Sequence, residues 1–176
     1  MEKSYKEYLK HITTFIFDVD GVLTDGRVII DSHGELLRTM NVKDGYALKT
    51  ALLQGYNMCI ISGGTNIGVK DRLAALGITD VFLGAHHKIE QFNSYIKKHQ
   101  IKPENVLYMG DDIPDIPVMN QVGLPTCPQN AVAEVREASS YISFKNGGDG
   151  CVRDVIEQVL KVQGKWMRDF DAKKAY

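Results

Sequence analysis

The sequence predicts an α/β fold: a doubly wound, Rossmann-like parallel sheet with one projecting β-hairpin and no separate cap domain. Short apolar runs with the length of buried strands alternate with segments of helical periodicity along the chain. Such alternation favours right-handed βαβ units with helices on both faces of the sheet. The length and an ordinary composition, 44% apolar and 24% charged, predict a single domain over residues 1–176.

The first buried strand is expected at Phe15–Phe17, because this run is almost continuously apolar. It ends on Asp18 and Asp20, and Gly21 follows at once. In an open parallel sheet the ligand site lies beyond the carboxyl ends of the strands. Side chains two residues apart on a strand share a face, so both carboxylates are expected at one site. Taken alone, this short motif also fits an acidic turn.

A hairpin is expected at about residues 22–42, directly after this strand. Two β-rich runs, Arg27–Ile30 and Leu36–Val42, flank a polar turn that contains glycine. The stretches 21–61 and 63–87 are too short to hold a separate cap domain. The hairpin is apolar on both faces, and this predicts that it packs against identical hairpins in an oligomer.

The remaining elements continue the alternation. Further strands are expected at Asn57–Ile61, Val81–Leu83, Asn105–Met109, Leu124–Cys127 and Tyr141–Phe144. Helices are expected at 3–10, 45–54, Gly68–Leu76, Lys88–His99, Ile116–Gln121, Ala131–Ala138 and Cys151–Val162. A glycine-rich loop precedes the last helix, and a polar tail at about 164–176 follows it.

Polar groups follow three further strands at the same predicted edge of the sheet. These groups are Ser62-Gly63-Gly64, Lys88, and Asp111-Asp112 with Asp115. Each group alone has an ordinary structural explanation: a helix cap, a solvated lysine or an acidic turn. Because all of them share one edge with Asp18 and Asp20, we interpret them as parts of one site.

The residue types at this edge fit phosphoryl transfer. Mg²⁺ prefers hard oxygen ligands such as carboxylates and phosphate oxygens. One carboxylate held beside the metal can attack phosphorus, and a second can protonate the leaving oxygen. A hydroxyl group and a lysine can hold the phosphoryl oxygens. The sequence therefore predicts a Mg²⁺-dependent enzyme acting on a phosphate ester.

Four motifs, in order and spacing over most of the chain, resemble those of the haloacid dehalogenase superfamily of phosphohydrolases. They are Asp18-x-Asp20 through Gly26, Ser62-Gly63, Lys88, and Gly110-Asp111-Asp112-x-x-Asp115. The resemblance implies Asp18 as nucleophile and Asp20 as acid and base, with catalytic roles for Ser62 and Lys88. It also implies Mg²⁺ held by the Asp18 carboxylate, the Asp20 carbonyl and Asp111, with Asp112 or Asp115 in support.

More narrowly, residues 41–46, 69–78 and 103–112 resemble the 3-deoxy-D-manno-octulosonate 8-phosphate phosphatases, which make a lipopolysaccharide sugar. The resemblance implies a homotetramer whose hairpins join in a barrel-like core. It also implies a set of substrate contacts: Asp20, Asn41, Val42, Lys43, Asp44, Gly45, Lys49, Gly63, Gly64, Arg72 and Lys88.

Two departures leave alternatives open. Gly64 and Asp149 stand where that family often has arginine. A nine-carbon keto-deoxy sugar acid 9-phosphate is therefore an alternative substrate, and a non-catalytic assembly domain of sugar-acid metabolism is an alternative function. A signalling receiver is disfavoured, because its phospho-accepting aspartate follows the third strand rather than the first.

Composition predicts the setting. The formal net charge of −1 gives no basic field, so nucleic acid is not an expected partner. No run approaches the roughly 20 apolar residues that span a bilayer, and residues 1–10 lack the apolar core of a secretory signal. The three cysteines lack metal-site spacing, and Cys59 fits a buried thiol, so we expect a cytoplasmic protein.

Overall fold

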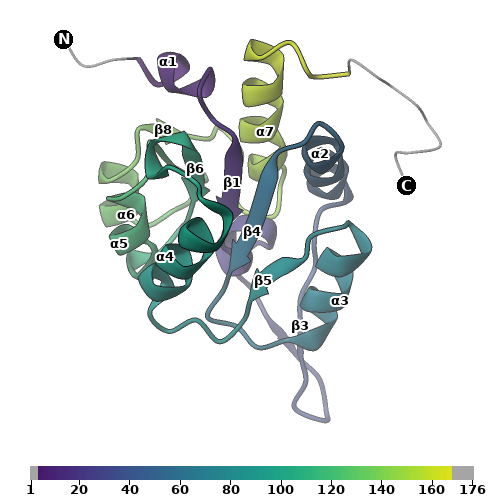
Figure 1. Ribbon diagram of the computed structural model, residues 1–176. Coiled ribbons are helices and arrows are strands. Elements are labelled where there is room, and N and C mark those ends of the chain that lie inside the picture. The colour runs from purple at the N-terminus through teal and green to yellow at the C-terminus, as the bar shows by residue number, and fades with distance from the viewer. Residues whose placement is uncertain (1–3, 168–176) are drawn as a thin grey trace.

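A computed structural model describes residues 4–167 of the chain, and its centre is a six-stranded parallel sheet (Figure 1). The strand order is β5-β4-β1-β6-β7-β8. The strands are β1 (Thr14–Phe17), β4 (Asn57–Ile61), β5 (Asp80–Phe82), β6 (Val106–Met109), β7 (Leu124–Cys127) and β8 (Tyr141–Ile142). The chain winds outward from β1 in both directions, which is the predicted doubly wound topology.

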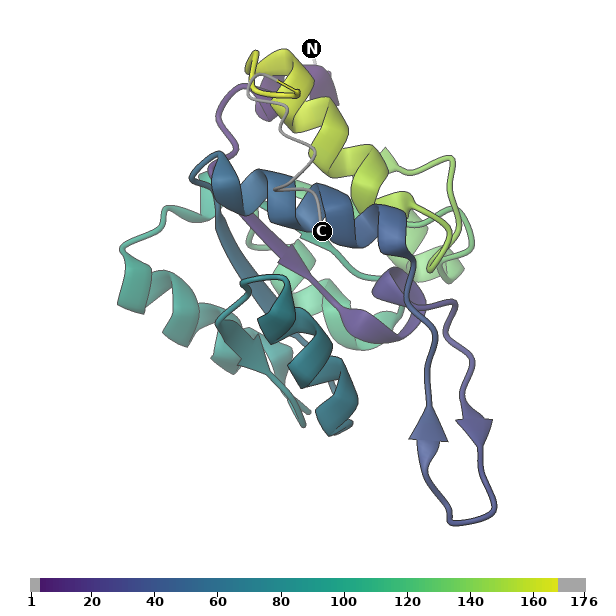
Figure 2. The same ribbon diagram turned by 90° about the vertical axis from the view of Figure 1, so that its right-hand side faces the viewer.

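Helices cover both faces of the sheet (Figures 1 and 2). One face packs against α2 (Val42–Leu53), α3 (Ile67–Ala75) and α7 (Cys151–Val162), with α1 (Tyr5–Leu9) beside α7. The other face packs against α4 (Lys88–His99), α5 (Ile116–Met119) and α6 (Ala133–Glu137). Among the described residues there is no separate cap domain.

The apolar strand runs follow from this double coverage. On β1, Phe15 and Phe17 point into the core under α2 and α7, whereas Ile16 points into the core under α4. All three side chains are fully buried. A strand buried on both faces needs apolar residues at successive positions rather than at every second one.

The register of the central strands brings their ends together. Phe17, the last residue of β1, lies opposite Ile60 of β4 and Met109 of β6. The residues that follow these three strands therefore lie along one edge of the sheet. This is the edge at which the sequence places its polar groups.

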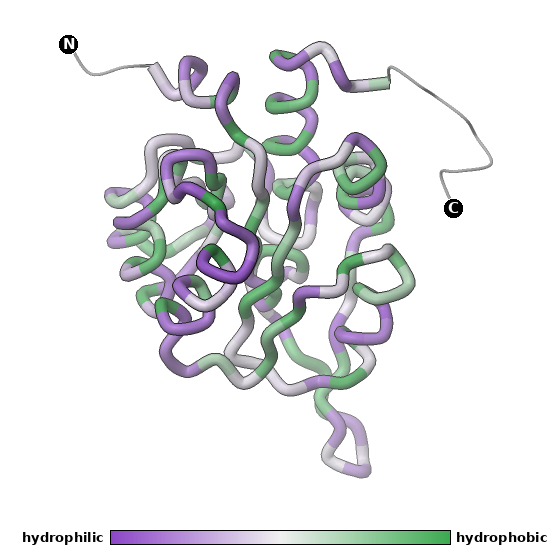
Figure 3. The backbone as a smooth tube through the Cα atoms, in the orientation of Figure 1, coloured by the Kyte–Doolittle hydropathy of each residue, from purple (hydrophilic) through white to green (hydrophobic). Residues whose placement is uncertain are grey.

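The hairpin projects from the body of the molecule (Figure 2). Its strands, β2 (Ile29–Ile30) and β3 (Leu36–Leu37), are antiparallel and shorter than predicted. Val42, which we expected at the end of the second run, instead begins α2, because the Asn41 side chain caps this helix by accepting from the Lys43 N–H at 2.9 Å. Figure 3 shows hydrophobic residues on the hairpin as well as in the sheet, and Ile30 is 69% exposed.

Several predicted elements are confirmed to the residue, namely Asn57–Ile61, Leu124–Cys127, Lys88–His99 and Cys151–Val162. The ends of most other predicted helices and strands differ from the observed ends by one to three residues. Residues 168–176 of the predicted tail lie outside the described residues. No helix within residues 4–167 is long and apolar enough to cross a membrane. The three cysteines are buried and free.

Candidate active site

A hollow of about 400 Å³ opens at the carboxyl edge of the sheet. All four predicted groups of polar residues line it: Asp18, Asp20, Ser62, Gly63, Gly64, Lys88, Asp111, Asp112 and Asp115. They come from the loops after β1, β4 and β6 and from the first residue of α4. Parallel strands in register thus gather residues that lie up to 97 positions apart in the sequence, from Asp18 to Asp115.

Three buried charges form the centre of the hollow. The Lys88 ammonium lies 2.9 Å from Asp18 Oδ2 and 2.7 Å from Asp115 Oδ1. All three side chains are less than 10% exposed. Asp18 Oδ1 also accepts the Val19 N–H at 2.7 Å, so the carboxylate is held from both sides. Lys88 is therefore a structural part of the site and not a solvated surface lysine.

Asp115 supports the other groups of the site. Its Oδ1 accepts from Lys88 and from the Tyr108 hydroxyl at 2.5 Å, and its Oδ2 accepts the N–H groups of Asp111 and Asp112. With both oxygens occupied in this way, Asp115 fixes the β6 loop and Lys88 together. A Cβ at Gly110 would lie 2.3 Å from Asp115, which explains the glycine.

Burial sets the electrostatics. Burial first, and then the nearby Asp115 carboxylate, raise the pKa of Asp18 to about 7, although Lys88 opposes the shift. The same two causes raise the pKa of Asp111 to about 7. Burial alone would lower the pKa of Lys88, but Asp18 and Asp115 together raise it. The hollow therefore holds an excess of carboxylates that a further cation would stabilise.

Asp111 has the features of a metal ligand. Its Oδ1 is buried and has no hydrogen-bond partner among the described residues. Carboxylate oxygens of Asp18, Asp111 and Asp115 all lie within 4.8 Å of one another. A Cβ on Gly21, whose φ is +88°, would lie 1.9 Å from Asp111 Oδ2, so only glycine lets this carboxylate approach the loop after β1. A divalent cation with oxygen ligands fits this donor set.

The loop after β1 is held in a compact turn. The buried hydroxyl of Thr24 accepts the N–H groups of Gly21 and Gly26, both at 3.2 Å. Gly148 donates to the Val22 carbonyl at 2.9 Å from the glycine-rich loop before α7. This turn fixes the position of Asp20 directly after β1.

Asp20 and Ser62 complete the rim of the hollow. The Asp20 carboxylate pairs with the guanidinium of Arg38, with Nε to Oδ1 at 2.7 Å and Nη2 to Oδ2 at 3.1 Å. Ser62 Oγ accepts the Gly64 N–H at 3.1 Å. Asn66, and not Ser62, caps α3, whereas Ser62 lines the catalytic hollow.

Comparisons with known proteins agree with this geometry. Residues 75–155 match a family model described as haloacid dehalogenase-like hydrolase. The chain is 40% identical over 156 residues to a 3-deoxy-D-manno-octulosonate 8-phosphate phosphatase of Escherichia coli (strain B / BL21-DE3), covering 89% of this chain and 83% of the relative. The chain belongs to this phosphatase family of haloacid dehalogenase-like hydrolases.

Solved structures of this phosphatase family have the same fold. A phosphatase from Yersinia pestis superposes with a TM-score of 0.92 at 33% identity, covering 96% of this chain and 91% of the other. One from Moraxella catarrhalis, in complex with a magnesium ion, a phosphate ion and a KDO molecule, gives 0.89 at 34% identity, with coverage of 93% and 94%.

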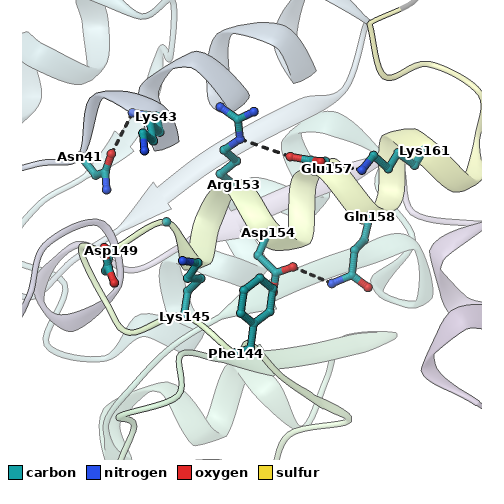
Figure 4. Close-up of a pocket in the computed structure, with 11 residues that line it drawn as sticks. Asn41, Lys43, Phe144, Lys145, Asp149, Arg153, Asp154, Glu157, Gln158 and Lys161 are labelled. Atoms are coloured by element: carbon teal, nitrogen blue, oxygen red, sulfur yellow. Dashed lines mark hydrogen bonds and ion pairs between the residues drawn. The ribbon is translucent and has the colours of Figure 1, made fainter.

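The predicted substrate contacts of the phosphatase family do not all face the catalytic hollow. Val42, Lys43, Gly45, Lys49 and Arg72 line a separate groove of about 680 Å³ along α2 and α3. Asn41 and Lys43 also line a third hollow, of about 540 Å³, beside α7 (Figure 4). Asp149, one of the two departures from the family pattern, lies at this third hollow as well.

Asp44, which the family resemblance implies as a substrate contact, lies buried between α2 and α7. Its side chain is buried, and its Oδ1 accepts the Arg153 N–H at the start of α7 at 2.7 Å. Burial raises the pKa of Asp44 to about 6. Within the described chain, this carboxylate joins α2 to α7 rather than facing the catalytic hollow.

Three residues of the site had no role in the sequence analysis: Arg38, Tyr108 and His86. Tyr108 lies inside a predicted strand, and its hydroxyl is recognisable as functional only from its bond to Asp115. His86 is exposed, and it lines the catalytic hollow. Arg38 belongs to the hairpin, and no motif or strand end marks it in the sequence.

Proposed function

We propose that this chain is a Mg²⁺-dependent phosphatase that hydrolyses 3-deoxy-D-manno-octulosonate 8-phosphate to the sugar acid and phosphate in lipopolysaccharide sugar biosynthesis. One observation carries the proposal: the buried Asp18 carboxylate, paired with Lys88, lies beside the unpartnered oxygen of Asp111. The E. coli relative has this activity in its name, and the M. catarrhalis structure contains magnesium, phosphate and KDO.

The carboxylates of Asp18 and Asp111 and the main-chain carbonyl of Asp20 would hold Mg²⁺. The orphaned oxygen and the raised pKa of Asp111 fit this role. When bound, the ion neutralises the repulsion between an anionic nucleophile and a phosphate group. Asp115 is committed to Lys88, Tyr108 and two main-chain N–H groups, so its role is to support the ligands.

The proposed reaction uses these side chains in two steps. An Asp18 oxygen attacks phosphorus, and the bond from phosphorus to the sugar oxygen breaks. Asp20 protonates that leaving oxygen, which gives the free sugar acid and an aspartyl-phosphate at Asp18. Asp20 then takes a proton from water, and the water oxygen attacks phosphorus and releases phosphate and Asp18. Lys88, the Ser62 hydroxyl and the Gly63 N–H hold the phosphoryl oxygens.

We further propose a cytoplasmic homotetramer joined by the hairpins. Ile29, Ile30 and Leu37 are 60%, 69% and 48% exposed on a two-stranded ribbon that would be marginal in water by itself. Lys43 and Lys49 lie away from the catalytic hollow of their own chain. An oligomer would allow them to serve the site of a neighbouring subunit.

A substrate screen tests this function. Purified protein is assayed for phosphate release from the eight-carbon and the nine-carbon sugar-acid phosphates, with Mg²⁺ and with a chelator, beside Asp18→Asn as the inactive control. We expect Mg²⁺-dependent turnover with the higher kcat/KM on the eight-carbon ester. Preference for the nine-carbon ester would change the assigned substrate. No turnover on either ester would favour the non-catalytic assembly domain.

A further inference from the structure

Arg38 brings a cation into the active site from the hairpin. It follows β3, and its guanidinium makes two parallel hydrogen bonds to Asp20, at 2.7 and 3.1 Å. The side chain of Arg38 is only 8% exposed, whereas that of Asp20 is 35% exposed. A bidentate pair of this kind fixes both partners in direction as well as in distance. The acid and base of the proposed reaction is therefore held by a residue outside the four strand-end motifs.

The base of the hairpin is tied to the loop after β4. The Leu36 carbonyl accepts from Arg38 Nη1 at 2.9 Å and from Asn66 Nδ2 at 3.0 Å. Asn66 also caps α3, by accepting the Val69 N–H. The position of Arg38 is thus fixed relative to the loop that carries Ser62 and Gly64.

Gly64 lies against the ion pair of Arg38 and Asp20. A Cβ at this position would lie 3.1 Å from Asp20 Oδ2 and 3.5 Å from both Arg38 Nη2 and Ser62 Oγ. The Arg38 guanidinium therefore lies at the rim of the catalytic hollow, next to the groups that would hold the phosphoryl oxygens. A side chain at residue 64 would crowd this arrangement.

The pair with Arg38 competes with the acid and base role of Asp20. A general acid must carry its proton on one of its two carboxylate oxygens, and both oxygens of Asp20 accept N–H bonds from Arg38. A guanidinium stays charged in proteins, so Arg38 needs another anion if it leaves Asp20. The carboxylate of a sugar acid offers the same fork of two oxygens.

The position of the pair suits this exchange. Asp20 lines the catalytic hollow, whereas Arg38 lines a neighbouring hollow of about 400 Å³ on the hairpin side, together with Met40, Asn66 and Arg72. The ion pair therefore separates the two hollows. A substrate with its phosphate at Asp18 and its carboxylate beyond Asp20 would meet the guanidinium first.

We propose that Arg38 is the specificity-determining cation for the sugar-acid part of the substrate, and that its transfer from Asp20 to the substrate carboxylate frees Asp20 for proton transfer. This inference rests on the proposed function, because it assumes a phosphate ester that carries a second anionic group. It gives the hairpin a role in choosing the substrate.

The test compares two esters in Arg38→Gln, with Arg38→Lys as the conservative variant. Arg27→Gln is the matched control, since it removes an exposed arginine of the same hairpin. A charge-assisted hydrogen bond contributes about 1.5–3 kcal/mol. We therefore expect Arg38→Gln to lower kcat/KM on the octulosonate ester by roughly 10- to 100-fold. Turnover of p-nitrophenyl phosphate, which has no carboxylate, should fall by a much smaller factor than turnover of the octulosonate ester, and the kcat/KM of Arg38→Lys on the octulosonate ester should lie between those of wild type and Arg38→Gln.

A second measurement uses the free sugar acid as an inhibitor of p-nitrophenyl phosphate hydrolysis. Arg38→Gln should weaken inhibition by the sugar acid but not inhibition by inorganic phosphate. Equal losses on both esters would overturn the inference and make Arg38 a support of Asp20 only, and unchanged kinetics on both would overturn it too. If Arg38→Gln does not fold, the same two measurements on Arg38→Lys decide. A wild-type protein inactive on the octulosonate ester would refute the proposed function instead.

Discussion

Removing Lys88 tests the electrostatic centre of the site. In Lys88→Met, the carboxylates of Asp18 and Asp115 stay buried and lose the ammonium group that lies within 3 Å of both. Breaking a buried ion pair by deleting one partner costs about 3–5 kcal/mol, because the remaining charge is not compensated. For a chain of this size, that loss lowers the melting temperature by about 10 °C.

The same helix offers a matched control. Lys98 also pairs with a carboxylate, Asp80, at 2.7 Å, but its side chain is 63% exposed. Lys98→Met should therefore cost at most about 1 kcal/mol. The measurement is thermal unfolding of both variants and the wild type, without metal, from pH 5 to pH 8.

The pH dependence separates electrostatics from packing. Burial and Asp115 already raise the pKa of Asp18 to about 7, and loss of Lys88 removes an effect that lowers it. At low pH the carboxyl groups bind protons, so the deficit of Lys88→Met should shrink as the pH falls. Equal losses of melting temperature in Lys88→Met and Lys98→Met would refute this account of the site. A loss in Lys88→Met that stays constant from pH 5 to pH 8 would refute it too.

Four further variants test other parts of the structure. Asp18→Asn should fold normally yet lose several orders of magnitude of turnover, measured as phosphate release, because its amide cannot attack phosphorus. Asp111→Ala should weaken Mg²⁺ binding, measured by titration calorimetry without substrate. Ile29→Glu should dissociate the oligomer in light scattering and lose turnover of the sugar phosphate, while keeping some on a small ester. Asp44→Asn should flatten the pH dependence of the unfolding free energy. Burial raises the pKa of Asp44 to about 6 in the folded protein. In the wild type, Asp44 therefore makes the unfolding free energy fall by about 3 kcal/mol as the pH rises from about 4 to 6.

Each of these expectations has an opposing result. Near-normal turnover in Asp18→Asn, or an unchanged calorimetric titration of Asp111→Ala, would remove that residue from its role. A wild-type protein that is monomeric at working concentrations would refute the hairpin interface without any variant. An Asp44→Asn protein with the wild-type pH slope would mean that the Asp44 carboxylate is hydrated rather than buried.

The sequence predicts the arrangement of the site because parallel strands impose it. Once Phe15–Phe17 and Asn57–Ile61 are recognised as buried neighbours, the residues after them must share an edge. The alternation of strand and helix is visible in the apolar pattern, so the central elements could be placed nearly to the residue. The ends of the hairpin could not, because the Asn41 cap that begins α2 early competes with a continuous β-rich run.

The sequence by itself therefore determined the sheet, its catalytic edge and the four groups of residues that meet there, since local periodicity and strand order suffice for these. Only the tertiary structure decided how the groups divide their roles. Both oxygens of Asp115 accept hydrogen bonds from its neighbours, which favours a supporting role over that of a metal ligand. Asp44 turns inward to α7, and Arg38 reaches Asp20 from a hairpin 18 residues further along the chain. Such contacts depend on side-chain direction and burial, which no pattern along a single chain encodes.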